Sequence, residues 1–343
     1  MLPQIHYPFR VFISYAHADK PLVEAIIAQL KDFGLQPLWD KDIGAGKPFP
    51  NEIKEMIARS HIFMPIITEN SNSRPWVHQE TGFAIALNIP VLPICIGSMP
   101  TEMISEIHGV VVKDDLSDLL NKLDSINLVR IVEQNPPNAL QPFEVTEWPE
   151  QRGETIVKLS KRVLELGDYS FVRSQARFTP FSIPDVEIDD PTWDEREGGS
   201  KRSPYLRNIQ REERKILGIH AKHAGCRLII DPMGEVMAEQ GNQARKARLR
   251  CLRDFIKSMP PDKIEVAVSS QASHKNLLVL GDHFLSESVA YRANAGYVNA
   301  IFNSHPPRVF QSIRSFDQLF DDLDRQGKTG IQTAIDALES QLV

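Results

Sequence analysis

The chain has little cysteine and no long apolar run, and each shortage excludes a class of protein. Its three cysteines, Cys95, Cys226 and Cys251, are too few and too scattered among 343 residues for the disulfide framework of a small secreted protein. The longest apolar run is interrupted by proline well short of the roughly 20 residues that a membrane helix needs, and residues 1–9 contain no apolar signal core. We therefore expect a soluble protein of the reducing cytoplasm that binds no membrane itself.

The chain also lacks a large excess of either charge. Its 39 lysines and arginines stand against 45 aspartates and glutamates, for a formal net charge of −6. This mild acidic excess argues against a nucleic-acid footprint over the whole chain but permits a local basic patch. With 42% hydrophobic and 24% charged residues the composition is that of a globular protein, and the length predicts about two domains.

The first third alternates short apolar runs with helical periodicity, which is typical of βαβ units and a parallel sheet. The expected strands are 10–14, 36–39, 62–67, 89–94 and 109–112. The expected helices are 21–33, a segment ending at 59, 76–87 and 115–123, with Asp19 capping the first helix and Gly34 following it. Because the strands are almost continuously apolar, both faces of the sheet should be covered. The predicted fold class is α/β.

The composition shifts after the first domain. Prolines are frequent over 134–149 and 179–204, so residues 131–204 are predicted to be a linker or wrapping segment with one helix at 153–166. Residues 205–343 are predicted to be a second α/β domain, after a first domain at 1–130. Its expected helices are 207–224, 242–259, 306–324 and one after Gly330, and its expected strands are 227–230, 263–268 and 276–280.

Four motifs in the first domain follow a recognisable order. They are Phe12–Tyr15, Trp39–Asp40 with Ile43–Phe49, Ser71–Glu80 and Pro90–Ile94. From about Arg10 to Leu123 the chain resembles a Toll/interleukin receptor (TIR) domain. The resemblance implies a flavodoxin-like parallel sheet of about five strands, and either a signalling scaffold or an enzyme that cleaves NAD+.

Glu80 and Trp76 separate these two functions. They are four residues apart on an expected helix and therefore share one face. The resemblance implies that catalytic members carry this pair, whereas scaffold members commonly lack the glutamate. Nicotinamide is already a cationic leaving group, so its release needs no general acid and builds positive charge on the ribose. A carboxylate can stabilise that charge and a flat aromatic ring can position the substrate, so we expect Glu80 to be catalytic and Trp76 to bind NAD+.

Further site residues follow from the same resemblance. We expect Ser14, Tyr15, Phe49 and Ser71 to line the substrate site, although Ser14 and Tyr15 could simply end the first strand. The resemblance also implies that Gly44, Gly46 and Lys47 form a loop that contacts a neighbouring copy, so that the TIR domains self-associate.

Two features bear on how NAD+ would be held. Ala16 stands where several family members have a basic residue, so His17 or Lys20 would have to contact phosphate. Pro48 replaces the Ser/Thr of a phosphate loop, and no GxGxxG motif follows a strand. NAD+ is thus expected as a substrate, with no cofactor and no metal.

The second domain carries three weaker signals. His274, Lys275 and Asp282 faintly resemble one half of a degenerate phospholipase D-like fold, although the histidine and lysine are adjacent instead of separated as in HxK. The residues His220, His223 and Cys226 have a spacing that could hold a metal, but a core role for Cys226 is favoured.

A stripe of basic residues lies along the second expected helix of the second domain, 242–259. It consists of Arg245, Lys246, Arg248, Arg250 and Arg253. It is either a solvated face paired with acidic neighbours or a site for nucleic acid or a phosphorylated nucleotide.

The leading hypothesis from the sequence is an NAD+ glycohydrolase that releases nicotinamide and gives ADP-ribose or a cyclic isomer. Assembly through the second domain, driven by an unknown ligand or partner, would activate it. By resemblance such chains are prokaryotic effectors of antiviral defence or signalling. The alternative is a non-catalytic TIR scaffold that mediates protein–protein interaction in signal transduction.

Overall fold

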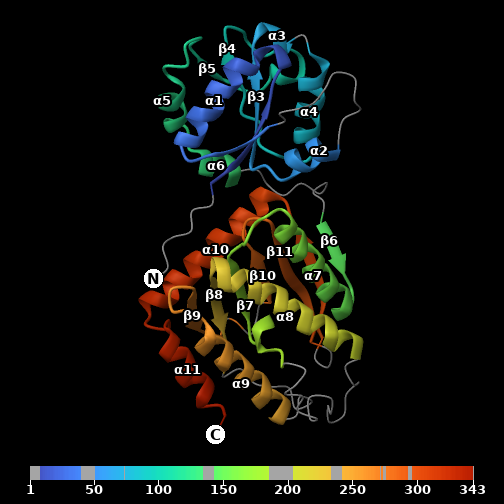
Figure 1. Ribbon diagram of the computed structural model, residues 1–343, viewed down its shortest axis with the longest axis vertical. Coiled ribbons are helices and arrows are strands. Elements are labelled where there is room, and N and C mark those ends of the chain that lie inside the picture. The colour runs from blue at the N-terminus through green and yellow to red at the C-terminus, as the bar shows by residue number, and fades with distance from the viewer. Residues whose placement is uncertain are drawn as a thin grey trace. The chain divides into compact units, whose positions relative to one another are not determined.

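The computed structural model describes residues 8–39, 51–72, 74–133, 143–184, 204–232, 242–270, 272, 276–292 and 296–342. They form two compact units, each with its own sheet (Figure 1). The N-terminal unit contains the described residues of 8–133 together with His305–Gln311, and the C-terminal unit contains those of 143–304 and 312–342.

The N-terminal unit is built on a parallel sheet of five strands in the order β2-β1-β3-β4-β5. The strands are β1 (Arg10–Ser14), β2 (Gln36–Leu38), β3 (Ile62–Ile67), β4 (Ile94–Ile96) and β5 (Val110–Val112). This is the order expected of a doubly wound sheet, and it confirms the predicted fold class. Parallel strands end at one edge, so the segments that follow them gather there.

Helices cover both faces of this sheet, as its apolar strands predict. Val11 and Ile13 of β1 belong to a core that includes residues of α1 and α5, whereas Phe12 between them packs with α2 and α4 on the opposite face (Figure 1). The helices are α1 (Lys20–Asp32), α2 (Asn51–Ala58), α3 (Glu69–Asn72), α4 (Pro75–Ala86), α5 (Leu119–Asp124) and α6 (Leu128–Glu133), with the short 3-10 helices η1 (His17–Asp19) and η2 (Glu102–Ile104).

One predicted strand of this unit differs from the structure. The segment 89–94 was expected to be a strand, but β4 begins only at Ile94, and Val91 forms an isolated bridge with Phe63. Pro90 and Pro93 have no N–H group to donate to a neighbouring strand, which limits regular pairing to the residues beyond them. Gly34, by contrast, adopts a φ of 84° just after α1, as expected of a residue that ends a helix.

The C-terminal unit has a mixed sheet of seven strands in the order β6-β12-β11-β10-β7-β8-β9. The strands are β6 (Phe143–Thr146), β7 (Val172–Ala176), β8 (Cys226–Ile230), β9 (Ile264–Val268), β10 (Leu277–Leu280), β11 (Phe284–Arg292) and β12 (Gly296–Asn303). The neighbours β7, β8 and β9 are parallel, and the remaining pairings are antiparallel. The C-terminal unit is therefore α/β in class, and its sheet has an antiparallel half that the sequence did not predict.

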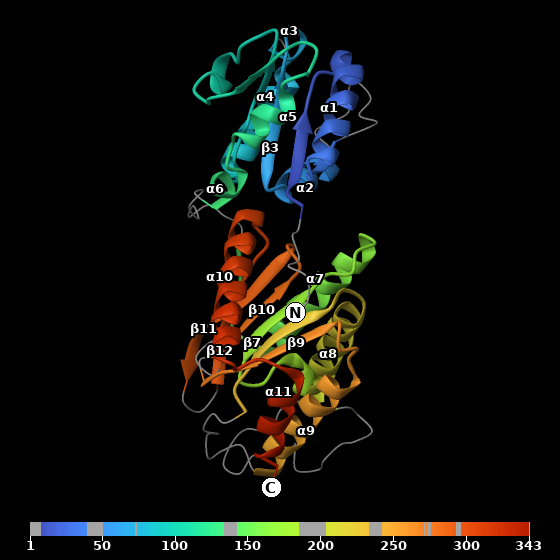
Figure 2. The ribbon, with the colours of Figure 1, turned by 90° about the vertical axis from the view of Figure 1, so that its left-hand side faces the viewer.

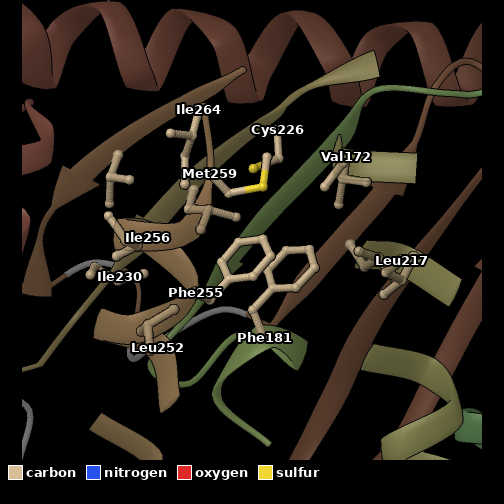
Figure 3. Close-up of a cluster of buried hydrophobic side chains, with 14 of the residues drawn as sticks. Val172, Phe181, Leu217, Cys226, Ile230, Leu252, Phe255, Ile256, Met259 and Ile264 are labelled. Atoms are coloured by element: carbon tan, nitrogen blue, oxygen red, sulfur yellow. The ribbon is translucent and has the colours of Figure 1, made fainter. Parts of the chain in front are cut away.

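Helices also cover both faces of this second sheet (Figure 2). Residues of α7, α8, α9 and α11 share one core with the strands, and α10 lies on the other face. In that core the rings of Phe181 and Phe255 stack 4.0 Å apart beneath Cys226 and Met259 (Figure 3). The helices are α7 (Pro149–Glu165), α8 (Pro204–Ala224), α9 (Asn242–Ser258), α10 (Pro306–Arg325) and α11 (Ile331–Glu339), with the 3-10 helix η3 (Pro180–Ser182).

The structure places the domain boundary earlier than the sequence did. Residues 131–204 were predicted to be a linker with one helix, and the second domain was predicted to start at 205. The segment instead supplies β6, α7 and β7 to the C-terminal unit, which therefore begins near residue 143. Strand β7 has the sequence Val-Arg-Ser-Gln-Ala, and Arg173 and Ser174 are both buried in it. A strand with buried polar residues lacks the apolar pattern on which such predictions depend.

Arg173 is buried because a cluster of opposite charges lies around it. It is in register with Arg227 of β8, which in turn is in register with Glu265 of β9. Asp317 of α10 accepts hydrogen bonds from Arg173 Nε at 2.9 Å and Nη2 at 2.8 Å, and from Arg227 Nη1 at 2.8 Å. Glu265 accepts a further bond from Arg227 Nε at 2.7 Å. Two arginines and two carboxylates thus fix α10 on this face of the sheet.

Replacing Asp317 by alanine should destabilise the C-terminal unit strongly. Both arginines would lose a carboxylate that they share, and removing one member of a buried ion pair costs on the order of 3 kcal/mol. Urea unfolding followed by circular dichroism measures the change. Asp321→Ala, at an exposed position one turn further along α10, is the matched control and should unfold like the wild type. Equal stability of the two variants would contradict the proposed role of the cluster.

Stability should also fall below neutral pH because His305 is buried. It is 4% exposed, and burial lowers its pKa from 6.5 to about 4. The unfolded chain takes up a proton near pH 6.5 and the folded chain does not until about pH 4, so stability present above pH 6.5 is lost as the pH falls. We expect about 2 kcal/mol from this group between pH 7 and pH 5.

The variant His305→Gln tests this pH dependence. Urea unfolding of the wild type and the variant at pH 7 and pH 5 gives the loss of stability for each protein. The loss should be smaller in the variant, whatever its stability at pH 7. An equal loss in both proteins would assign the pH dependence to other groups.

Candidate functional site

The candidate site lies where the strands of the N-terminal sheet end. Pro75 follows Arg74, whose φ of −103° and ψ of 110° are extended, and α4 begins at Pro75. A proline disfavours helical geometry in the residue before it and fits the first helical turn, which explains why the helix expected at 76–87 begins here. Helix α4 then carries Trp76 and Glu80 along the face of the sheet formed by Phe12 and Phe63.

Two of the predicted site residues meet directly. Ser14 is the last residue of β1 and is 1% exposed, and Glu80 lies in the second turn of α4 and is 2% exposed. The Ser14 hydroxyl donates a short hydrogen bond to Oε2 of Glu80. A hydroxyl that donates to a carboxylate makes one of the stronger hydrogen bonds in proteins. The bond therefore fixes the orientation of the Glu80 carboxylate at the carboxyl end of the strand.

The two aromatic candidates lie on opposite faces of the sheet. Trp76 is partly buried and packs against the core that contains Phe12, on the same face as Glu80. Tyr15 packs against the core that contains Val11, and its ring lies 6.3 Å from that of Trp39. Successive residues of an extended chain point to alternate faces, which separates Tyr15 from Ser14. The structure thus places Ser14, Trp76 and Glu80 on one face of the sheet and Tyr15 on the other.

Ser71 belongs to a polar network instead. Its hydroxyl accepts a hydrogen bond from the backbone N–H of Thr68 at 2.7 Å, and it is 1% exposed. The carboxylate of Asp19 accepts from Thr68 Oγ1 and from Asn70 Nδ2, each at 2.6 Å. Asp19 precedes α1, but its side chain does not cap that helix as predicted. It connects the segment after β1 with the segment after β3.

A second set of hydrogen bonds connects the segment after β3 with the segment after β4. Asn72 Nδ2 donates to Ser98 Oγ at 2.7 Å and to the Met99 carbonyl at 2.8 Å. The sequence reasoning missed Thr68, Asn70 and Asn72 as residues of this network. Their signal was a run of polar residues directly after a buried strand, which is where a parallel sheet gathers its loops.

The remaining predicted residues of the first domain are only partly described. Phe49 and the loop residues Gly44, Gly46 and Lys47 lie outside the described residues. His17 lies in η1 and Lys20 begins α1, so both follow β1 at the edge that holds Ser14.

The three residues His220, His223 and Cys226, whose spacing could hold a metal, each make different contacts. His220 is buried and accepts a hydrogen bond from the Ser170 N–H at 3.1 Å, with its Nε2 3.1 Å from the Ser160 carbonyl. His223 stacks on Tyr169 with 4.0 Å between ring centroids. Cys226 is fully buried, and burial raises the pKa of its thiol. Among the described residues no group of three or more His, Cys, Asp or Glu side chains could hold a metal ion.

Of the three residues that resemble a phospholipase D-like motif, the structure describes only the last, Asp282. His274 and Lys275 lie outside the described residues. Asp282 is buried after β10, with its Oδ1 4.0 Å from Nε2 of His283.

The basic stripe of α9 is divided between different surroundings. Arg253 forms an ion pair with Asp254 at 2.7 Å, and Arg250 is exposed. Arg245 instead donates to the Pro232 carbonyl just after β8, and Arg248 donates to Ser182 Oγ of η3. The stripe is therefore not one continuous solvated face.

Comparisons with known proteins assign a family to the first domain. Residues 11–125 match the family model described as TIR domain. No curated protein matches the chain. Among solved structures, the chain is similar to the crystal structure of polyphosphate kinase from Porphyromonas gingivalis at 9% identity and a TM-score of 0.22. The alignment covers 75% of this chain and 41% of that one, so the chain spans less than half the length of that kinase. No helix among the described residues is long and apolar enough to cross a membrane.

Asp19 should be essential to the order of this edge. The variant Asp19→Ala would leave the hydroxyl of Thr68 and the amide of Asn70 without their shared acceptor, at a cost of about 1–3 kcal/mol. Urea unfolding measures the loss, and hydrogen exchange should be faster at residues 68–72. Asp32→Ala, at the exposed end of α1, is the control and should change neither quantity. Unchanged exchange at 68–72 in Asp19→Ala would contradict the network's role.

Proposed function

We propose that the TIR domain at residues 11–125 cleaves NAD+ to nicotinamide and ADP-ribose or a cyclic isomer. At the level of the family, a TIR domain supports either signalling or this reaction. The observation that favours the reaction is the Glu80 carboxylate, held by the Ser14 hydroxyl at the carboxyl end of β1. That end of a parallel α/β sheet is where such folds bind ligands.

The reaction needs one group that stabilises positive charge, and Glu80 can supply it. The bond between nicotinamide and the ribose breaks with its electron pair moving to nicotinamide, which leaves neutral, so no proton donor is needed. Positive charge then develops on the ribose, and the fixed Glu80 carboxylate stabilises it. Water completes the reaction to ADP-ribose and releases one proton, whereas an internal nucleophile of the substrate gives a cyclic isomer.

Ser14 and Trp76 have supporting roles in this proposal. Ser14 positions the carboxylate by donating to Oε2, so that the charge does not reorient when the substrate binds. Trp76 lies one helical turn before Glu80 on the same helix, where its ring can stack on a ring of the substrate. Both residues keep their roles only while α4 stays packed against β1.

The C-terminal unit has the role of a sensor in this proposal. A ligand or partner that binds it would bring TIR domains of several copies together, and the segment containing Gly44, Gly46 and Lys47 would contact a neighbouring copy. The protein would then act in signalling or defence in the cytoplasm. This part follows from the resemblance to TIR effectors alone.

The alternative function is a scaffold that recruits other TIR domains without catalysis. One observation favours it: Glu80 is only 2% exposed, and Ser14 and Glu80 together anchor α4 to β1. A carboxylate with this purely structural role would be needed for folding and would leave NAD+ intact.

Release of nicotinamide from NAD+ tests the proposal. The full chain is assayed at high concentration with a crowding agent, which favours assembly, and nicotinamide is separated by chromatography. Glu80→Gln should lower turnover at least about 100-fold, because the amide cannot stabilise a developing positive charge as a carboxylate does. Ser14→Ala should lower kcat about tenfold with little change in KM, as expected of a positioning residue.

Glu24→Gln is the matched control. Glu24 is exposed on α1 of the same domain, so the same change of charge should leave turnover as in the wild type. Thermal unfolding of each variant shows whether it is folded. Turnover retained by a folded Glu80→Gln variant would overturn the assignment of Glu80, and wild-type protein that assembles without cleaving NAD+ would favour the scaffold.

A further inference from the structure

Helix α10 contributes to both units. It is one continuous helix of 20 residues, Pro306–Arg325, but the segment His305–Gln311 belongs to the N-terminal unit. From Ser312 onward the helix belongs to the C-terminal unit. Hydrogen bonds between successive turns hold a helix together, so its two parts move independently only if the helix itself breaks. A change that loosens one part of α10 therefore acts on the other part as well.

The first part of α10 packs where two strands of the N-terminal sheet begin. The ring of Phe310 lies 4.9 Å from that of Phe9 in an edge-to-face arrangement, and 6.4 Å from that of His61. Phe9 directly precedes β1, and His61 directly precedes β3. Aromatic rings at these distances and angles attract each other and exclude water. Phe310 thus attaches α10 to the starts of two neighbouring strands.

Two further residues attach this part of α10 to helices of the same unit. Gln311 Nε2 donates a hydrogen bond to the carbonyl of Glu133, the last residue of α6, at 2.7 Å. His305 directly precedes α10 and is 4% exposed. Burial lowers its pKa, and the backbone of Leu87 and Asn88 raises it by a smaller amount. The imidazole of His305 therefore faces the residues that directly follow α4.

The second part of α10 is attached to the C-terminal sheet by buried charge. Asp317 accepts hydrogen bonds from Arg173 and from Arg227, on neighbouring strands. The guanidinium of Arg227 also lies 4.6 Å from the ring centroid of Phe320, one turn further along α10. Removing the helix from the sheet would take from both arginines the carboxylate that they share, which is costly for buried charges.

The elements that α10 contacts in the N-terminal unit are those of the candidate site. Strand β1 begins after Phe9 and ends at Ser14, and α4 carries Glu80 and ends just before Leu87. The hydroxyl of Ser14 and the carboxylate of Glu80 meet through these two elements. Both elements are therefore held at one end by the side chains of the site and at the other by the segment His305–Gln311.

We propose that α10 couples the two units, so that weakening its attachment to the C-terminal sheet also loosens β1, β3 and α4 of the N-terminal unit. The two states are α10 attached to both units and α10 released from one of them. Such a coupling is a free energy that the two attachments share, and it acts in both directions. It is a property of the fold and holds whether the N-terminal unit cleaves NAD+ or acts as a scaffold.

Hydrogen exchange of the full chain, followed by mass spectrometry, tests the coupling. Asp317→Asn weakens the attachment of α10 to the C-terminal sheet and keeps the size of the side chain. Exchange should become at least about threefold faster at residues 9–12, 61–63 and 87–89, which belong to the other unit. Asp321→Asn makes the same change at an exposed position one turn further along α10 and should exchange like the wild type.

A second substitution shows whether the effect passes through α10. Phe310→Ala removes the ring that contacts Phe9 and His61, so it weakens the attachment of α10 to the N-terminal unit. In this background, Asp317→Asn should speed exchange in the N-terminal unit by less than about half as much as it does alone, because the connection is already weakened. An equal effect of Asp317→Asn in both backgrounds would overturn the proposal.

Exchange within α10 provides the internal reference. Residues 313–323 should exchange faster in Asp317→Asn than in the wild type, and circular dichroism shows that the variant is folded. Phe320→Leu, which removes the ring beneath Arg227, takes its place where Asp317→Asn does not fold. Faster exchange at 313–323 with unchanged exchange throughout the N-terminal unit would overturn the proposal and make the two attachments of α10 independent.

Discussion

The C-terminal sheet buries two arginines on neighbouring strands because Asp317 of α10 pairs with both of them and Glu265 of β9 also pairs with Arg227. Burying a charge without a partner costs several kcal/mol, so β7 could not occupy the middle of this sheet with Arg173 in it unless α10 covered that face. The pairing therefore couples three features of the fold that are set by distant parts of the sequence. They are the position of β7 in the sheet, the face that α10 covers, and the residue at which the second unit begins. Strand β7 and helix α10 are separated by more than a hundred residues in the sequence, and the position of each depends on the ion pair with the other.

Buried charge in the N-terminal unit has a different arrangement. Glu80 meets a hydroxyl, that of Ser14, where Asp317 meets two cations. A hydroxyl that donates to a carboxylate orients it without adding an opposite charge. In the proposed reaction the oriented Glu80 carboxylate stabilises positive charge on the substrate, whereas in the scaffold alternative the same bond only anchors α4 to β1. The nicotinamide assay of Glu80→Gln separates these two roles, which the bond itself serves equally well.

The sequence predicted those strands whose own residues form a continuous apolar run. In the first domain the strand at 62–67 is apolar throughout and the strand at 10–14 is apolar in its three central residues, and the structure has both with the same bounds. It also predicted that Trp76 and Glu80 share a helix, since their spacing alone decides this. Strand β7 could not be found in this way, because its buried Arg173 pairs with Asp317 of α10, more than a hundred residues away, and no local pattern contains that information. The antiparallel strands β11 and β12 were missed as well, together with the role of Asp19, which depends on Thr68 from another loop.

In both units the segments that follow parallel strands come together at one edge of the sheet. In the first sheet Ser14, the last residue of β1, meets Glu80, and Thr68, the residue after β3, meets Asp19. In the second sheet Pro232, the second residue after β8, accepts a hydrogen bond from Arg245 of α9. A parallel sheet thus brings residues that are distant in the sequence to one edge, and no local pattern shows which charged side chain will meet them there.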